Sequence, residues 1–502
     1  MKRTSTALIC IIITLLSASI VNAQETRMVP AYRCLWIGPE GGTWNNAGGD
    51  PNAVWEAYEL SWTDQYGYLI NWTPMEDPAF TWPDLVSMAE FKDGAVVNVN
   101  EPPLSPIQGL VIRDATLTVN SDLTVVGDGQ DDGFMAVCVG QGANGTLNIN
   151  DGILTCGSAE GPLPGQTGPI ADGNGESRFF VGRAVNAADS AIGIVNQYGG
   201  TVRVAASHLQ IADIDYGEAR ELLGGFDGWG NLSLEERQAI AATSANSTYN
   251  MYGGILEVSS NIEVGKANGS YGIFNVYGGQ VNVGGALRAY YNGEMTIDGG
   301  TVNVTGSLVW PRGNPSFGLL TMLSGSLSFN DAVICESGVG ISDVNIVGGS
   351  FDCRTDWEAR GSGGAGQNQQ TIRIDCGSVE SVHFGSLNAA PDSGLMDIIL
   401  VAPKDTEPNN AATKVRIDGD VTFNGWTAIR IDVNDDFAGQ VGDSWELVNI
   451  GGTVTGMEQV LIVNDSPKYT FSVELIEKME NFDARNIITA TLTDIAPEEP
   501  AE

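Results

Sequence analysis

Positive charge and histidine are scarce in this chain of 502 residues. It has 24 Lys and Arg against 62 Asp and Glu, a formal net charge of −38, and only two His. So acidic a surface excludes nucleic acid as a partner, because phosphate backbones are held by clustered Lys and Arg. With two His and scattered Cys, the common zinc sites are excluded as well.

Long apolar runs are missing beyond the first 23 residues. No later segment has the roughly 18 unbroken apolar residues of a membrane-spanning helix. Residues 1–23 combine Lys2 and Arg3 with an apolar stretch over 7–20 and a small-residue end, which predicts a signal peptide. We therefore expect a secreted or cell-surface protein whose mature chain starts at Gln24 and has no transmembrane segment.

The six Cys that follow the signal peptide leave two interpretations open. The pairs Cys138/Cys156 and Cys335/Cys353 share a spacing of 18 residues, which predicts two equivalent disulfides in an oxidising compartment. The alternative is that the Cys are small buried core residues. Cys156 and Cys353 fall in an otherwise apolar column of the repeat described next, which favours core positions for these two.

Glycine is abundant, at 64 residues, and a Gly-Gly pair recurs inside one pattern. From Gly254 onward, the second glycine of the pattern recurs after 25, 21, 25 and 24 residues. The clear copies of the pattern are Val195–Val204, Tyr249–Val258, Phe274–Val283, Met295–Val304, Leu320–Phe329 and Val344–Cys353. A fixed period of this length is typical of a solenoid.

Each copy places short runs of alternating apolar and polar residues on both sides of the glycines and adds a third run, such as Asn261–Gly265. Alternation at period two predicts strands with one buried face, and the glycines predict tight turns. A single repeat cannot bury its apolar face, but a stack can. The predicted fold is therefore all-β: a single-stranded parallel β-helix, or β-solenoid, with rungs of about 21–25 residues.

Both ends of the predicted solenoid have a different composition. Six of the eleven Trp lie between Trp36 and Trp82, which predicts a Trp-rich cap over the first open end. Residues 213–246 are predicted to form an insertion, and a capping box at Ser233–Glu236 predicts a short helix within it. The predicted divisions are a signal peptide 1–23, a Trp-rich cap 24–95, a solenoid 96–401 with insertions at 157–178 and 213–246, a linker 402–413, and a β-rich cap 414–502.

Two polar columns of the repeat are candidates for binding. The first is formed by Asn148, Asn196, Asn250, Asn275, Thr296, Thr321 and Asn345. We expect these side chains to bond to one another up the stack, the alternative being a surface site. Tyr198, Tyr252 and Tyr277 lie two residues further on, on the same strand face. This row is the candidate carbohydrate-binding site, and the alternative is that it covers neighbouring rungs.

Calcium is the cofactor that the acidic loops would suit. Asp432, Asn434 and Asp436 occupy the first, third and fifth positions of a calcium-loop pattern, although Phe437 replaces its Gly and Asp443 its terminal Glu. The alternative is a solvated acidic surface. Acidic residues also gather around 128–132 and 213–221, and His208 and His383 lie in strand-like runs, but none sits in a recognisable catalytic motif, so no catalytic residue is predicted.

Three motifs resemble a known class of protein. They are the Trp/Gly segment 36–44, the Asn-x-x-Gly-Gly-x-Val-x-Val copies, and the segment 441–456 with its Gly-Asp-Ser-Trp. Together they resemble exported β-solenoid surface proteins of planctomycetes and related bacteria, which are similar to autotransporter passengers. The resemblance implies a structural or adhesive role without defined catalytic residues.

We therefore expect a secreted or surface structural protein whose partners are polysaccharide or other surface and matrix proteins. The alternative is a β-helix that binds or degrades polysaccharide, in the manner of a lyase or hydrolase.

Overall fold

A computed structural model of the chain describes residues 32–44, 55–63, 70–74, 87–103, 105–127, 136–157, 178–184, 191–205, 208–214, 246–266, 270–313, 316–336, 340–360, 369–391, 394–404, 413–464, 466–480 and 483–496. The predicted signal peptide, nearly all of both predicted insertions and the short helix at 233–242 lie outside these residues. The predicted linker 402–413 is described only in part. No helix within the described residues is long and apolar enough to cross a membrane.

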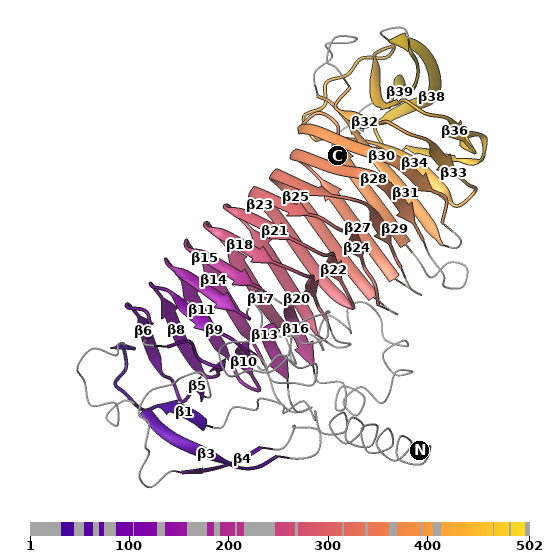
Figure 1. Cartoon of the computed structure of the whole chain (residues 1–502). Coiled ribbons are helices and arrows are strands. Elements are labelled where there is room, and N and C mark those ends of the chain that lie inside the picture. Colours follow the sequence, from indigo (N-terminus) through magenta and orange to yellow (C-terminus); the bar gives the residue numbers. More distant parts are fainter. Residues whose placement is uncertain are drawn as a thin grey trace, which may run out of the picture.

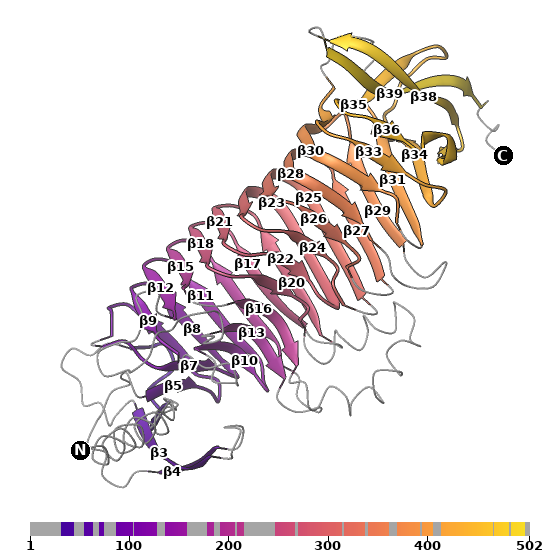
Figure 2. The same cartoon turned by 45° about the vertical axis from the view of Figure 1, so that its right-hand side comes forward.

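The predicted fold class is confirmed, because the chain winds into a parallel β-helix whose coils stack along one axis (Figures 1 and 2). Each coil contributes a strand to each of three long sheets, here called the first, second and third sheets. In one coil, β13 belongs to the third sheet, β14 to the first and β15 to the second. The same three strands of the next coil, β16, β17 and β18, pair with them in parallel.

The first sheet consists of β2 (Gly42–Thr43), β6 (Val96–Val99), β8 (Ala115–Val119), β11 (Gly145–Ile149), β14 (Gly193–Gln197), β17 (Asn246–Met251), β20 (Tyr271–Val276), the first parts of β23 (Asn292–Val304) and β25 (Ser316–Phe329), β27 (Gly340–Ile346), β29 (Gln369–Asp375), β31 (Leu395–Ala402), β34 (Thr427–Val433) and β37 (Leu461–Asn464). The second sheet consists of β9 (Leu123–Val125), β12 (Ile153–Cys156), β15 (Thr201–Val204), β18 (Ile255–Val258), β21 (Gln280–Val283), the second parts of β23 and β25, the first parts of β28 (Gly349–Ala359) and β30 (Val379–Ala389), β32 (Val415–Ile417) and β35 (Ser444–Ile450).

The third sheet consists of β1 (Tyr32–Trp36), β5 (Ser87–Phe91), β7 (Gly109–Ile112), β10 (Val137–Gln141), β13 (Phe179–Ala184), β16 (Leu209–Ile214), β19 (Ile262–Val264), β22 (Leu287–Ala289), β24 (Leu308–Trp310), β26 (Ala332–Ile334), the second parts of β28 and β30, β33 (Val421–Phe423) and β36 (Val454–Thr455). Four further strands lie at the ends of the molecule: β3 (Trp55–Thr63), β4 (Ile70–Pro74), β38 (Tyr469–Glu480) and β39 (Asp483–Ile495). A single turn of 3-10 helix covers Met457–Gln459.

Alternation in the sequence decides which side chains enter the core. In β21 the side chains of Val281 and Val283 are buried, whereas Gln280 is exposed and Asn282 is half-buried. The same registers repeat from coil to coil, so apolar residues stack into continuous inward columns. Each such side chain contributes about 1.5–3 kcal/mol on burial, which is why the stack is stable although no single coil has a core of its own.

The Gly-Gly pair forms the corner between the first and second sheets. A Cβ at Gly253 would lie 2.7 Å from the carbonyl oxygen of Tyr198 in the preceding coil. Gly254 has φ +78°, a conformation that costs other residues energy, and a Cβ there would meet the carbonyl of Gly200. The coils therefore stack too closely at this corner for a side chain on either glycine.

Both ends of the stack have caps. At the first end Trp36, Trp44, Trp55 and Phe91 pack with ring centroids 5.2–6.1 Å apart, and β3 pairs antiparallel with β1. At the other end the β38–β39 hairpin pairs antiparallel with β35. Parallel coil pairing extends outside the predicted 96–401 on both sides, from β1 with β5 to β34 with β37.

The predicted disulfides Cys138–Cys156 and Cys335–Cys353 do not form. Cys138 lies in β10 of the third sheet on the outward column shared with Phe180, whereas Cys156 ends β12 of the second sheet and packs into the interior. Cys335 follows the last residue of β26 and packs against the core, and Cys353 belongs to the core column of the second sheet. Only Cys156 and Cys353 therefore occupy the same column of the coil, and the equal spacing does not reflect two equivalent pairs. Burial raises the pKa of the Cys138 thiol to about 12.

Candidate functional site

Three tyrosines form an exposed stack on the corner between the first and second sheets. The side chains of Tyr198, Tyr252 and Tyr277 are 54%, 45% and 41% exposed. Their rings lie 5.1 and 5.2 Å apart, with interplanar angles of 8° and 15°. They are therefore stacked face to face along the solenoid axis, in the order of the coils.

The corner that carries the stack is held from inside by a buried polar link. The hydroxyl of Tyr249 donates to Oε1 of Gln197 at 2.7 Å, and Nε2 of Gln197 donates to the carbonyl of Ile255 at 2.9 Å. Both side chains are fully buried, and burial raises the pKa of Tyr249. The link connects the end of the first-sheet strand to the start of the second-sheet strand in the next coil, so the turn between them is fixed.

Two residues before the tyrosines, the predicted ladder is confirmed for its four asparagines, Asn148 to Asn275, and Thr296, Thr321 and Asn345 continue the same column in register. Nδ2 of Asn196 donates to Oδ1 of Asn148 at 3.0 Å, Asn250 donates to Asn196 at 3.0 Å, and Asn275 donates to Asn250 at 2.9 Å. Each inner amide both donates to one coil and accepts from the next. These side chains bond to one another, as in other stacked sheets.

Stacking restricts what the tyrosines can offer a ligand. Both faces of the Tyr252 ring are covered by its neighbours, so no sugar ring can stack on it. The ring edges and hydroxyls remain exposed. One face of Tyr198 and one face of Tyr277 lie at the two ends of the stack, and these are the surfaces where an apolar sugar face could pack.

The tyrosines are part of a longer apolar line that the sequence did not single out. Half of the fourteen exposed large hydrophobic residues in the described structure lie on this one corner. We call this set the corner stripe; its members are Ile153, Tyr198, Tyr252, Ile255, Tyr277, Leu323 and Val347. The stripe could have been recognised from the sequence, because Leu323 and Val347 occupy the tyrosine position of later repeats.

The calcium prediction concerns Asp432, Asn434 and Asp436. In the structure each has a different protein partner. Asp432 pairs with Arg373 at 2.6 Å, Asn434 donates to Asp375 at 3.2 Å, and Asp436 pairs with Lys404 at 2.5 Å. Each of the three side chains is therefore already engaged by another residue of the protein, and the described residues contain no group of three or more His, Cys, Asp or Glu placed to hold a metal ion.

A charged cluster on the outside of the third sheet was not predicted as a site. Oε2 of Glu263 accepts a hydrogen bond from Gln210 at 2.6 Å and pairs with Lys266 at 3.0 Å, while Arg288 lies 3.7 Å from its other oxygen. Burial alone would raise the pKa of Glu263, but Lys266, His208 and Gln210 outweigh it and hold that pKa below its usual value. In the sequence this cluster is marked only by one acidic residue within a strand-like run. In a chain with so many acidic residues, that does not indicate a site.

His383 lies on the outward face of the second sheet between two carboxylates. Its Nδ1 is 2.7 Å from Asp352, and its Nε2 is 3.1 Å from Asp418. Slight burial favours the neutral acid at Asp418, but hydrogen bonds from Arg416 and His383 outweigh this and lower its pKa. The arrangement brings together side chains of three successive coils and contains no nucleophile.

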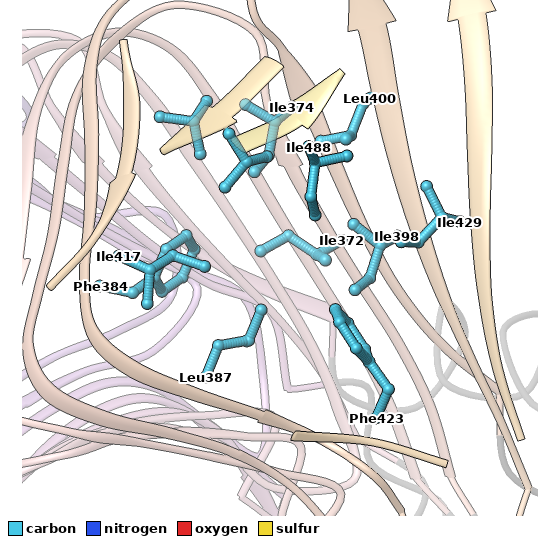
Figure 3. A pocket seen from close by; sticks show the side chains of 12 residues that line it. Ile372, Ile374, Phe384, Leu387, Ile398, Leu400, Ile417, Phe423, Ile429 and Ile488 are labelled. Atoms are coloured by element: carbon cyan, nitrogen blue, oxygen red, sulfur yellow. The ribbon is translucent and has the colours of Figure 1, made fainter. Parts of the chain in front are cut away.

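One hollow lies inside the last coils, beneath the second cap. Figure 3 shows aliphatic and aromatic side chains converging on it from all three sheets, together with Ile488 of β39. Its walls include Ile374 and Leu400 of the first sheet, Ile417 of the second and Phe423 of the third. With no polar group in its lining, it is a loosely filled part of the core rather than a place for acid–base chemistry.

Comparisons with known proteins identify no family for this chain. No protein-family model matches it, and no curated protein matches it significantly.

Proposed function

We propose that this protein is a secreted or cell-surface β-solenoid with a structural or adhesive role, as the resemblance to exported surface solenoids implies. The observation that carries the proposal is the asparagine ladder, in which outward side chains of successive coils bond to one another. This ladder ties its four coils to one another on the solvent side as well as through the core. A stiff, extended rod follows, which suits a spacer or matrix component.

Ion pairs along the other faces support the same role. Arg203 and Glu257 pair between adjacent coils at 2.8 Å, and Arg312 pairs with Glu336 at 2.9 Å. The remaining acidic side chains give the rod a net negative, solvated surface, which keeps it soluble and apart from its neighbours. The signal-peptide pattern over residues 1–23 supports export.

Localisation tests this proposal. Cells that produce the full chain are fractionated, and intact cells are labelled with a reagent that does not cross membranes. We expect the protein in the surface or extracellular fraction, labelled, and beginning at Gln24 by N-terminal sequencing. Unlabelled protein inside the cells with residues 1–23 intact would contradict the proposal.

Polysaccharide binding is the second candidate, and the exposed tyrosine stack is the observation that favours it. We propose binding rather than cleavage at this place. Glycoside hydrolysis needs a pair of carboxylates on either side of the bond, whereas the corner column from Tyr198 to Val347 contains one carboxylate, Asp298.

A further inference from the structure

We propose that the corner stripe binds an uncharged, extended polysaccharide that lies parallel to the solenoid axis, with about one sugar per coil. The inference rests on the polysaccharide-binding candidate above. It adds the class of polysaccharide, its orientation along the solenoid axis and the number of sugars per coil. The observations that carry it are the shape of the stripe, the uncharged side chains that form it within an acidic surface, and its period.

The stripe is long and narrow. From the coil of Ile153 to the coil of Val347 there are six coil-to-coil steps, or roughly 29 Å at about 4.8 Å a step. Across the axis it is only one or two residues wide, because the strands on either side present polar side chains. A stable protein interface needs about 800 Å² on each partner, and so narrow a line suits a single extended chain better.

The members of the stripe carry no charge although the protein is strongly acidic, and the one charged side chain in the tyrosine column, the exposed Asp298 between Tyr277 and Leu323, is an anion. On its first-sheet side lies the asparagine ladder, and on its second-sheet side Thr201, Gln280 and Thr301 share the column of Ile153 and Ile255. An anionic polysaccharide would be repelled by the surrounding carboxylates, whose field extends about 8–10 Å at physiological salt. An uncharged chain avoids this repulsion, so the charge pattern selects a neutral glycan.

The chemistry of the stripe fits the two kinds of surface that a pyranose presents. Stacked tyrosine hydroxyls recur every 5.1–5.2 Å, judged from the ring spacing, and can exchange hydrogen bonds with sugar hydroxyls. The aliphatic residues Ile255, Leu323 and Val347 can contact the C–H faces of the rings. A pyranose in an extended chain advances by about the spacing of the coils, so equivalent contacts repeat and their weak affinities combine.

Affinity electrophoresis of the mature chain in native gels tests the proposal. The gels contain a neutral polymer, either hydroxyethylcellulose, mixed-linkage β-glucan or galactomannan, or an anionic one, either alginate or polygalacturonate. We expect at least one neutral polymer to slow the protein and neither anionic polymer to do so. Tyr252→Ala should weaken that retention roughly tenfold, because it removes the central hydroxyl and interrupts the stack, and Tyr252→Phe should weaken it less because it removes the hydroxyl but keeps the stack.

Trp426→Ala is the matched control, since Trp426 is 44% exposed but lies outside the stripe. We expect this variant to keep full retention, and thermal unfolding of every variant shows that the fold is intact. Retention by anionic polymers alone, retention unchanged in a variant with all three tyrosines replaced by alanine, or no retention by any neutral polymer would each overturn the proposal. Localisation at the cell surface together with no retention would reject this inference and leave the structural role standing.

Discussion

Two columns of side chains run along the same strands of this molecule, only two residues apart, and use the stacking of the coils differently. In the asparagine column every inner amide is engaged by the coils before and after it. In the tyrosine column the rings cover one another's faces but leave their edges and hydroxyls in solvent. The period of the repeat is the same in both.

A repeating column of side chains can therefore be either structural or ligand-binding. The two kinds differ in whether the polar groups of the column already have hydrogen-bond partners within the stack. A column whose hydrogen bonds are all made within the stack stabilises the fold and has little left for a ligand. A column that stacks but keeps free hydroxyls contributes less to folding and can bind. The substitutions below test this distinction, beginning with the largest expected effect on the free energy of unfolding.

Glu263→Gln tests a charged group whose carboxylate oxygens, like the amides of the asparagine column, already have partners in the protein. Removing the carboxylate leaves Lys266 and Arg288 without their buried partner, so we expect a loss of about 3 kcal/mol at pH 7, measured by urea unfolding.

The loss should depend on pH. The folded-state pKa of Glu263 lies below its unfolded value, so its contribution is present above about pH 4.5 and disappears as the pH falls through the folded pKa. A difference between wild type and variant that grows under acid would contradict this account.

Gly254→Ala alters the turn that connects the two columns. The new Cβ would adopt a positive φ and meet the carbonyl of Gly200 in the preceding coil. We expect a destabilisation of about 2 kcal/mol, read from the denaturation midpoint. Gly425→Ala is the control, since it has open space around it and no positive φ; equal losses in the two variants would show that the corner does not need its glycine.

Asn250→Ala interrupts the ladder at its centre. It removes the bond that Asn250 donates to Asn196 and the bond that it accepts from Asn275. We expect a loss of about 1.5 kcal/mol, measured by the same unfolding experiment, with no change in polysaccharide retention. A variant as stable as wild type would mean that the ladder follows from the fold without supporting it.

Tyr252→Ala should have the smallest effect on stability. The side chain is nearly half exposed and its hydroxyl serves no bond within the stack, so we expect a loss below about 1 kcal/mol. A loss larger than that of Asn250→Ala would reverse the roles assigned to the two columns.

Much of the fold followed from the sequence because a solenoid is governed by local rules. The Gly-Gly spacing predicted the corner at Gly253 and Gly254, and the alternation in Gln280–Val283 predicted which residues are buried. The asparagine ladder followed once the repeats were placed in register. In each case residues one coil apart are also neighbours in space, so the period of the sequence predicts which residues contact each other.

The predictions that failed or fell short needed information on which sheet each residue joins. Cys138 and Cys156 share a coil but face opposite sides of its wall, which spacing alone does not reveal. Glu263 meets Gln210 and Arg288 from two other coils of the third sheet, where no motif repeats. The calcium pattern at Asp432, Asn434 and Asp436 did not take account of the basic residues that the neighbouring strands bring to them.

The most direct test of the roles of the two columns is a crystal structure of the mature chain with a neutral, β-1,4-linked oligosaccharide of about six sugars. We predict sugar density along the corner stripe, parallel to the axis, with hydrogen bonds to the hydroxyls of Tyr198, Tyr252 and Tyr277 and none to the amides of Asn196 or Asn250. A sugar bound across the axis, bound to the asparagine column, or bound only at another face would contradict the account.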